Sequence, residues 1–362
     1  MKKFLVSLVV LLCVGLAYLV AWPVPIEPAV WSPSVDPGYT GDFAQNERLS
    51  SATYLDLPDG EYGPEDIALG PDGRLYTAVH SGKILRFDLD TGEFDTFAST
   101  GGRPLGIEFA NDGTLWVADA YIGLLSIDRD GVISERATAT TSGSPILYAD
   151  DVDIAADGRV YFSDASTRFG AKAIGGTLAA SLVDLMEHSS NGRVLVYDPA
   201  TDETDVFAED LTFANGVAVS ADSRSLFVNE TGTYAVHRYS LAGDSYGRKT
   251  TVLSGLPGFP DNINRMPDGS LWLGIVSPRS PAMDSLAGSP FLRKLVMRLP
   301  ASARPGPQAY GFVLKIDDDG SVLDNLQDPS GNYSSTTGAI QLDDGRLVVS
   351  SLTEPRIAII SP

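Results

Sequence analysis

The chain has little cysteine, little histidine and few basic residues, and each shortage excludes a class of protein. Among 362 residues there is one cysteine, Cys13, and it lies in an N-terminal apolar run. The rest of the chain has no thiol, so disulfide bonds, thiolate metal sites and cysteine nucleophiles are excluded. Lys and Arg number 26 against 47 Asp and Glu, which gives a formal net charge of −21. Because no basic surface can neutralise phosphates, we expect no nucleic-acid partner.

The excess of acidic residues has two interpretations. Carboxylates keep a protein soluble, and some of them can instead bind a metal ion. The chain also lacks a G-x-S-x-G motif, so nothing indicates a serine hydrolase. Glycine and proline, in contrast, are frequent at 36 and 23 residues. This composition favours a fold with many short turns.

The N-terminal apolar run is predicted to be a membrane anchor. Lys2 and Lys3 precede an uncharged stretch, Phe4 to Trp22, and a helix of that length nearly spans a hydrocarbon core of about 30 Å. A signal peptide usually has a shorter apolar region before a small-x-small cleavage site. We therefore interpret 1–22 as an uncleaved transmembrane signal anchor, with a signal peptide as the alternative. We expect a single pass with the folded part on the extracytoplasmic side, periplasmic, extracellular or lumenal. Residues 23–46 form a Pro-rich linker.

Residues 47–362 contain a repeat. Its unit is an apolar-rich strand, a turn of the Asp-Gly type, and a second strand that ends in small or acidic residues. Alternation at period two is typical of strands, and Asp-Gly between two such runs is a strong hairpin signal. Six copies occur, and in the fourth a serine replaces the turn glycine. The copies span 64–79, 104–119, 149–164, 214–230, 260–275 and 338–351.

Most copies are followed by a third strand and often by a fourth. Six four-stranded units spaced about forty to sixty residues apart predict an all-β fold, a six-bladed β-propeller, behind the anchor helix. Residues 47–57 are expected to supply a strand that closes the ring with the last blade. Two inserts, 168–190 and 278–308, interrupt the third and fifth repeats.

Polar residues stand at the start of each innermost strand, where a propeller brings its blades together at one end of the central channel. They are Glu65 and Asp66, Asp150 and Asp151, Asn215, and Asp261 and Asn262. Oxygen-only ligands suit calcium, which takes six to eight of them. Zinc is disfavoured because the repeat region has no cysteine and the three histidines do not fall at these positions. The alternative is that these Asp and Asn side chains satisfy local backbone groups, as they often do at turns.

Several long stretches resemble a known family. They are GRPLGIEFANDGTLWVADAYIGLL (102–125), VYFSDASTRF (160–169), the run 191–228 and LPGFPDNINRMPDGSLWLG (256–274). On these the chain resembles the strictosidine synthase-like family over roughly residues 50–360. It is more distantly similar to serum paraoxonases, gluconolactonases and diisopropyl fluorophosphatase.

The resemblance to paraoxonase-like propellers implies a ligand set for a catalytic calcium ion, Ca²⁺. Its positions fall on Glu65, Asp150, Asn215, Asp261 and Asn262, and Asp150 stands where an asparagine is usual. A second, structural calcium would use Asp66, Asp151 and the backbone carbonyl of Ile107.

Two departures from the relatives limit the function. The paraoxonase histidine pair falls on Leu105 and Asp119, and the stretch 333–345 lacks the glutamate that a strictosidine synthase uses. We therefore expect a calcium-dependent hydrolase of a small ester or lactone, of arylesterase or lactonase type, with the metal as Lewis acid. Asp261 is the candidate nucleophile or general base, and Asp119 is a second candidate. The alternatives are a non-catalytic, metal-stabilised binding propeller and, third, a condensing synthase.

The insert 278–308 holds an expected helix. Phe291, Leu292, Leu295, Val296 and Leu299 are spaced as one helix face, with Arg293, Lys294 and Arg298 beside it. It is interpreted either as a helix that caps the propeller or as a lid that also touches the membrane surface. The insert 168–190 is interpreted as a second wall of the same pocket.

Overall fold

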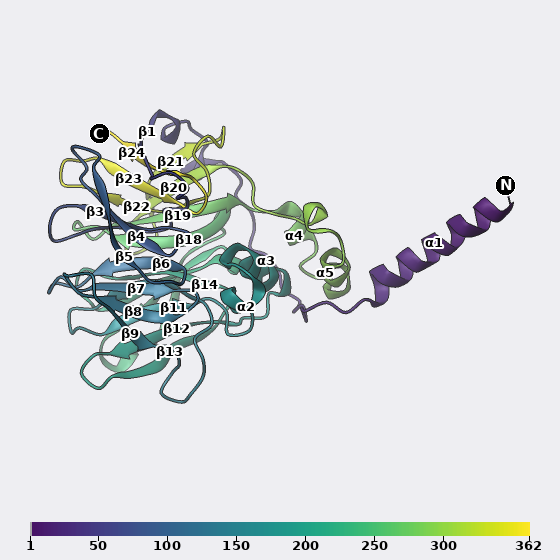
Figure 1. Ribbon diagram of the computed structural model, residues 1–362, viewed down its shortest axis with the longest axis horizontal. Helices are drawn as coiled ribbons and strands as arrows, with labels where there is room; N and C mark the ends of the chain where they lie inside the picture. Colours follow the sequence, from purple (N-terminus) through teal and green to yellow (C-terminus); the bar gives the residue numbers. More distant parts are fainter. Residues whose placement is uncertain (1) are drawn as a thin grey trace.

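The computed structural model describes residues 2–362, and it has six four-stranded antiparallel sheets arranged as the blades of a propeller (Figure 1). This confirms the predicted fold class. The first three blades are β2 (Ile67–Leu69), β3 (Leu75–Ala78), β4 (Lys83–Phe87) and β5 (Phe94–Ser99); β6 (Pro104–Phe109), β7 (Leu115–Asp119), β8 (Gly123–Ile127) and β9 (Ile133–Ala137); and β10 (Ala149–Ile154), β11 (Val160–Asp164), β12 (Gly192–Asp198) and β13 (Glu203–Leu211). The last three are β14 (Ala214–Val219), β15 (Ser225–Glu230), β16 (Ala235–Ser240) and β17 (Lys249–Ser254); β18 (Gly258–Arg265), β19 (Leu271–Pro278), β20 (Gly311–Ile316) and β21 (Val322–Asp328); and β22 (Thr336–Gln341), β23 (Leu347–Ser351), β24 (Arg356–Ile360) and β1 (Thr53–Asp56).

The ring closes by pairing the two ends of the propeller. Strand β1 runs antiparallel to β24, with Thr53 opposite Ile359. The sixth blade is therefore built from both ends of the repeat region, as the sequence predicted for 47–57. This pairing makes β1 the outer strand of the last blade, so the two ends of the repeat region are held together in one sheet.

The hairpin turns follow the Asp-Gly signal. Gly73 and Gly113 have φ of 77° and 87°, in the left-handed region that glycine enters without a Cβ penalty. In the fourth blade Ser223 takes the same position with φ 53°. A non-glycine residue pays roughly 1–2 kcal/mol for that conformation, so the fourth turn is the strained one of the series.

Glycines in the strands allow neighbouring blades to approach closely. A Cβ at Gly274 would lie 2.2 Å from the carbonyl carbon of Thr337 in the next blade. A Cβ at Gly216 would lie 2.5 Å from the backbone oxygen of Asp261. These contacts set the inner strands at a spacing that only a missing side chain permits, and they bring the strand starts together around the channel.

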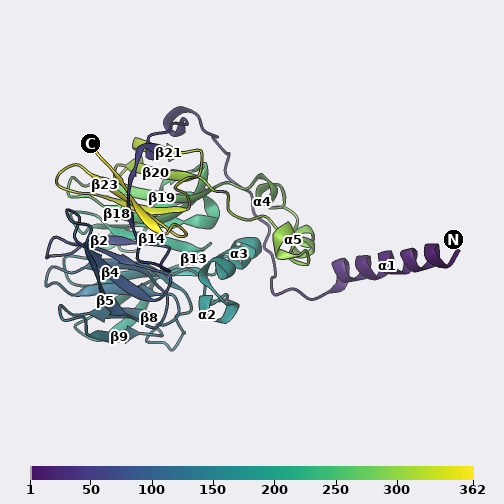
Figure 2. The ribbon, with the colours of Figure 1, turned by 45° about the horizontal axis from the view of Figure 1, so that its top comes forward.

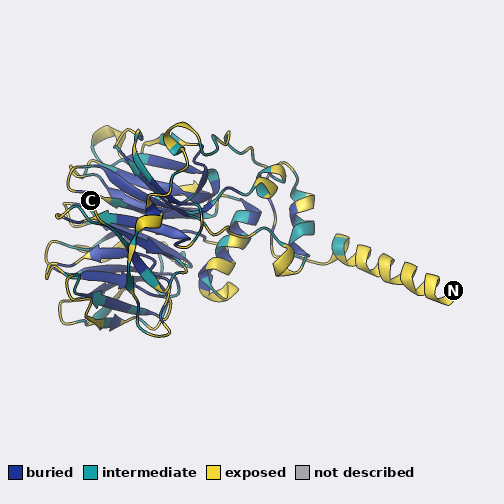
Figure 3. Cartoon of the chain, turned by 90° about the horizontal axis from the view of Figure 1, so that it is seen from above, coloured by how far each residue is buried: buried dark blue, intermediate teal, exposed yellow. Residues whose placement is uncertain are grey.

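Helices lie outside the propeller on one side. Helix α1 (Lys2–Ala21) projects away and has no buried residue. Helices α2 (Ala171–Ile174) and α3 (Thr177–Glu187) belong to the insert in the third blade, and α4 (Pro281–Ser285) and α5 (Pro290–Met297) to the insert in the fifth. Figures 1 and 2 place these four helices between the blades and α1. Figure 3 shows the contrast between the buried inner strands and the exposed α1.

The Pro-rich segment that follows α1 is extended but packed. The Ala29 N–H donates to the Glu187 carbonyl at 3.0 Å, and Trp31 stacks on His188 with ring centroids 3.8 Å apart. Arg279 donates to the Ser34 carbonyl at 2.7 Å. The segment thus runs along the helices of the two inserts and ties them to the N-terminal end of the chain.

Candidate metal centre and pocket

One pocket opens on the helical side of the propeller. Its volume is about 1010 Å³, including the solvent-open space at its mouth. Leu105, Tyr148, Phe213 and Phe259 make much of its wall apolar, and α3 and α4 add residues such as Leu185 and Met283. The wall also carries a small set of polar groups. An apolar pocket with few convergent polar groups is the usual form of a small-molecule site.

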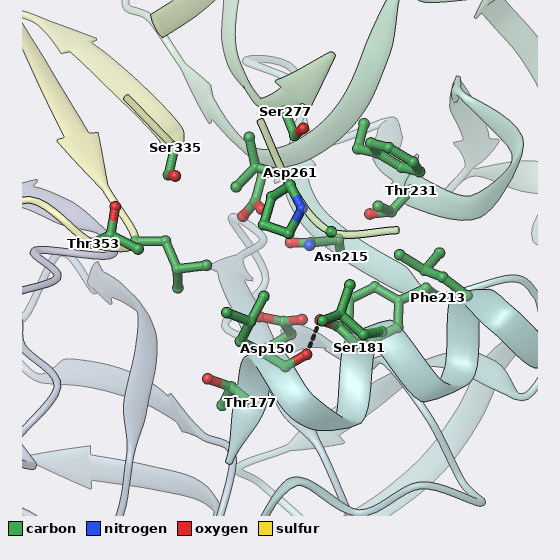
Figure 4. Close-up of a pocket in the computed structure, with 18 of the residues that line it drawn as sticks. Asp150, Thr177, Ser181, Phe213, Asn215, Thr231, Asp261, Ser277, Ser335 and Thr353 are labelled. Carbon is green, nitrogen blue, oxygen red and sulfur yellow. Dashed lines mark hydrogen bonds between the residues drawn. The ribbon is translucent and has the colours of Figure 1, made fainter. Parts of the chain in front are cut away.

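Four of the predicted ligands line this pocket from four different blades. Glu65 lies just before β2, Asp150 is in β10, Asn215 in β14 and Asp261 in β18. Figure 4 shows Asp150, Asn215 and Asp261 directed toward one another in the pocket. The fifth, Asn262, is wholly buried beside them. The fold therefore brings together residues that are up to 197 positions apart in the chain.

Hydrogen bonds from neighbouring blades hold these residues in place. The Asn262 amide donates to Glu65 Oε1 and to the Glu65 carbonyl, each at 3.2 Å. The Thr337 hydroxyl donates to that carbonyl at 2.5 Å. The Asn229 amide donates to the backbone oxygen of Asp261 at 2.6 Å. Sequence patterns did not indicate Thr337 or Asn229, because their role depends on contacts between blades.

Several oxygens in the site have no hydrogen-bond donor. Glu65 Oε2, Asn215 Oδ1 and Asn262 Oδ1 are buried and lack any partner. A buried acceptor left unpaired costs about 1–3 kcal/mol, so three in one place call for a cation or another donor. Within residues 2–362, no three acidic, histidine or cysteine side chains form a metal-binding cluster on their own. The carboxylates of Glu65, Asp150 and Asp261 and the amide oxygens of Asn215 and Asn262 together form a mixed oxygen set of the kind that calcium takes.

The electrostatics of the site point the same way. Burial, and then the charges of Asp261 and Asp150, raise the pKa of Glu65 well above its ordinary range. Burial and Asp261 raise the pKa of Asp150 in the same direction. Burial raises the pKa of Asp261 to about 7. Three neighbouring carboxyls with raised pKa values indicate that the site lacks a compensating positive charge. A bound divalent cation would lower these pKa values again.

Arg103 is a second feature that sequence reasoning missed. It is 1% exposed, and its Nε and Nη2 have no hydrogen-bond partner. Its positive charge opposes the rise in the pKa values of Glu65 and Asp150. The only available signal was its place in the stretch GRPLG, which carried the family resemblance but no stated role.

The residues of the predicted second calcium site are engaged with backbone groups. Asp66 Oδ2 accepts the Ile107 N–H at 2.9 Å, and Asp151 Oδ2 accepts the Val217 N–H at 2.8 Å. The first contact links blades one and two, and the second links blades three and four. These acids therefore connect the blades, and the second metal ion stays a prediction.

Asp119, the second catalytic candidate, lies outside the pocket wall. Its Oδ1 accepts the N–H groups of Arg103 and Tyr121, both at 2.9 Å, and its Oδ2 accepts the Thr100 hydroxyl at 2.7 Å. It is wholly buried and is not among the residues that line the pocket. These local hydrogen bonds favour a structural role for Asp119, and its catalytic role stays a prediction.

The same structural acid recurs in other blades. Asp164 accepts the Tyr148 N–H at 2.9 Å, and Glu230 accepts the Thr212 N–H at 2.8 Å. Each stands at the end of its blade's second strand, as Asp119 does. The repeat itself therefore contained the signal that this position stabilises the entry into the inner strand.

Comparison with known proteins gives the family. The family model "Strictosidine synthase-like, N-terminal" matches residues 41–87, and "Strictosidine synthase" matches 150–244. Strictosidine synthase-like 13 of Arabidopsis thaliana is 32% identical over 317 residues, covering 78% of this chain and 77% of that protein. The adipocyte plasma membrane-associated protein of Salmo salar is 32% identical over 355 residues, covering 91% and 83%. The chain belongs to the strictosidine synthase-like family.

Solved structures share the fold at low identity. A gluconolactonase of Xanthomonas campestris superposes with a TM-score of 0.62 and 18% identity, over 93% of this chain and 98% of that one. Regucalcin of Agrobacterium tumefaciens, a calcium-binding protein, superposes with a TM-score of 0.58 and 15% identity, over 86% of this chain and 93% of that one. At these identities the likeness establishes the six-bladed fold.

Proposed function

We propose that the protein is a calcium-dependent hydrolase of esters or lactones whose active site is the metal centre in the channel. The observation that carries this proposal is the group of unpaired oxygens and proton-retaining carboxyls at one end of an apolar pocket. The gluconolactonase and regucalcin on the same fold support a lactonase chemistry with calcium.

The ligands would be Glu65, Asp150, Asn215, Asp261 and Asn262, which supply carboxylate and amide oxygens. When bound, calcium supplies a Lewis acid that polarises an ester carbonyl and stabilises negative charge on its oxygen. The apolar wall, including Leu105 and Phe213, would hold the acyl or ring part of a substrate and limit the access of water.

Asp261 is the residue we assign to proton transfer or attack. It lines the pocket beside the other proposed ligands, where a carboxylate can act as a general base or nucleophile on a substrate held by the metal. The Asn229 amide fixes the backbone of Asp261, so the carboxyl is presented from a rigid strand. Asp150 and Glu65 stay beside it as the negative charges that hold the cation.

The test compares two buried acids in the purified full-length chain, with calcium and with a chelator. Asp261→Asn is expected to abolish calcium-dependent turnover of aryl acetates and lactones while the fold is retained. Asp119→Asn is the matched control, because it removes a buried carboxylate outside the pocket; it should lower thermal stability and keep turnover per folded molecule. If the wild-type protein binds calcium but turns over none of a broad ester panel, the hydrolase is refuted and a binding propeller remains.

A further inference from the structure

Helix α5 exposes large apolar side chains to the outside of the protein and buries a charged one. Phe291 and Leu292 are 56% and 42% exposed, whereas Arg293 beside them is fully buried. Arg293 donates to the carbonyls of Met186 and Glu187 at the C-terminal end of α3, at 3.1 and 3.2 Å. A helix that faces water normally has the reverse pattern. The two large apolar side chains are therefore held outward by a buried ionic side chain.

The end of α5 is attached to the end of the candidate anchor. Arg298 donates to the carbonyl oxygens of Trp22, at 2.5 Å, and Leu19, at 3.1 Å. The Tyr18 hydroxyl donates to the Arg298 carbonyl at 3.2 Å. Helix α1 has a mean hydropathy of 2.8, and its C-terminal end is where a membrane-spanning helix leaves the hydrocarbon region. These contacts place α5 next to the point at which α1 would leave the hydrocarbon region of a membrane.

The pocket opens among the same helices. Leu178 and Leu182 of α3 line the pocket and are 40% and 37% exposed. Arg293 ties α3 to α5, so the leucines at the mouth and the apolar residues of α5 belong to one packed layer. Figures 1 and 2 show this layer on the side of the propeller that faces α1.

The basic residues of this layer are mostly engaged inside it. Of the five in 278–308, Arg279, Arg293 and Arg298 are buried, and Lys294 is paired with Glu27. The outer surface of the layer is therefore defined by its exposed apolar side chains and not by charge. A surface that continues a candidate membrane anchor and exposes large apolar side chains fits a lipid bilayer.

We propose that Phe291 and Leu292 rest in the surface of the membrane that α1 enters, and that the pocket takes a lipophilic, uncharged ester or lactone directly from that membrane. The substrate part of this inference rests on the proposed hydrolase function, whereas the membrane contact does not. A substrate dissolved in lipid would pass between the exposed leucines of α3 into an apolar pocket without crossing bulk water.

The contact is tested with nitroxide labels on the full-length chain in nanodiscs of phosphatidylcholine and phosphatidylglycerol. A Cys13→Ala background allows a single labelled cysteine at Phe291→Cys or, as control, at Phe94→Cys. Phe94 is 50% exposed and starts β5 at the end of its blade opposite Glu65. We expect the label at 291 to collide more with oxygen and less with an aqueous nickel chelate than the label at 94. Equal, water-like accessibility at both sites would overturn the membrane contact.

The substrate part is tested by turnover of two esters in the same nanodiscs, a long-chain ester dissolved in the bilayer and a short water-soluble one. A Phe291→Ser, Leu292→Ser variant should lose about tenfold or more on the long-chain ester, because two apolar anchors are removed, and keep its rate on the short ester. Delivery from the membrane would be overturned if the variant cleaved both esters at the wild-type rates, or if it lost the same factor on both. If the wild type cleaves neither ester, the hydrolase fails and the label measurement alone decides the membrane contact.

Discussion

Calcium binding should release protons, and the stability of the calcium-free protein should fall as pH rises. In the folded chain the pKa of Asp261 is raised from 3.8 to about 7, chiefly by burial. The folded state therefore holds this proton more tightly than the unfolded state does, and raising the pH through that window destabilises the fold. For Asp261 alone, the free energy of unfolding should fall by at most about 4 kcal/mol between about pH 4 and pH 7. Glu65 and Asp150, raised in the same direction, add to this trend.

In the proposed site calcium would compete with these protons for the same oxygens. With a pKa of about 7, Asp261 is half protonated at about pH 7 and roughly nine-tenths protonated at about pH 6. The protonation of Asp261 alone should weaken the apparent calcium affinity roughly fivefold, or by about 1 kcal/mol, when the pH falls from about 7 to about 6. Saturating calcium should also remove the loss of stability with rising pH, since the carboxylates are then neutralised.

Titration calorimetry measures both effects. Calcium is titrated near pH 6 and near pH 7 in buffers of different ionisation enthalpy, which gives the number of protons released per ion. Thermal unfolding is then followed with calcium and with chelator over the same range. Asp150→Asn should reduce the number of protons released, and Asp119→Asn should not change it. Calcium binding with no proton release, and an affinity independent of pH, would refute the electrostatic account of the site.

Three further outcomes test the structure itself. Gly274→Ala should lower the free energy of unfolding, measured by denaturant titration, by about 2–3 kcal/mol, because the new Cβ would meet the Thr337 backbone at 2.2 Å. Gly288 has open space around it, so Gly288→Ala is the control and should change the same free energy by less than about 0.5 kcal/mol. Burial raises the pKa of Glu230, but its hydrogen bonds outweigh burial and lower the pKa to about 2. The ionised carboxylate therefore stabilises the fold at pH values above 4.5, and this contribution is lost as the pH falls toward 2. Glu230→Gln should make acid unfolding, followed by circular dichroism, less steep in that range. Arg293→Met should weaken the helical layer by about 3 kcal/mol, seen as faster amide exchange in α3 and α5 with the blade strands unchanged.

The blades could be predicted from sequence because their signals are local. Period-two alternation and the Asp-Gly turns specify hairpins without reference to the rest of the chain. Once six hairpin repeats are recognised, ring closure follows, and the starts of the inner strands must converge. For this reason Glu65, Asp150, Asn215 and Asp261 were expected to converge, and they line one pocket although up to 196 positions separate these four residues.

Features that depend on contacts between distant segments could not be predicted in this way. Helical spacing grouped Phe291 and Leu292 on an apolar face, but it did not show that this face is exposed and that Arg293 is buried. That outcome depends on the carbonyls at the end of α3, more than 100 positions away. For Asp119 the repeat itself carried a signal for a second interpretation. Its counterparts Asp164 and Glu230 were visible in the sequence, and a position shared by several blades is typical of a structural role.

Arg103 and Asp150 are best understood together, through the charge of the site. Asp150 stands where the resemblance to paraoxonase-like propellers implies an asparagine, so the carboxylates of Glu65, Asp150 and Asp261 would bring a charge of −3 when ionised. A divalent cation would leave one negative charge uncompensated in a buried place, which is costly at low dielectric. Arg103, also buried and with two unpaired nitrogens, brings the sum to zero. The extra carboxylate is thus compatible with cation binding because this chain buries an arginine beside it.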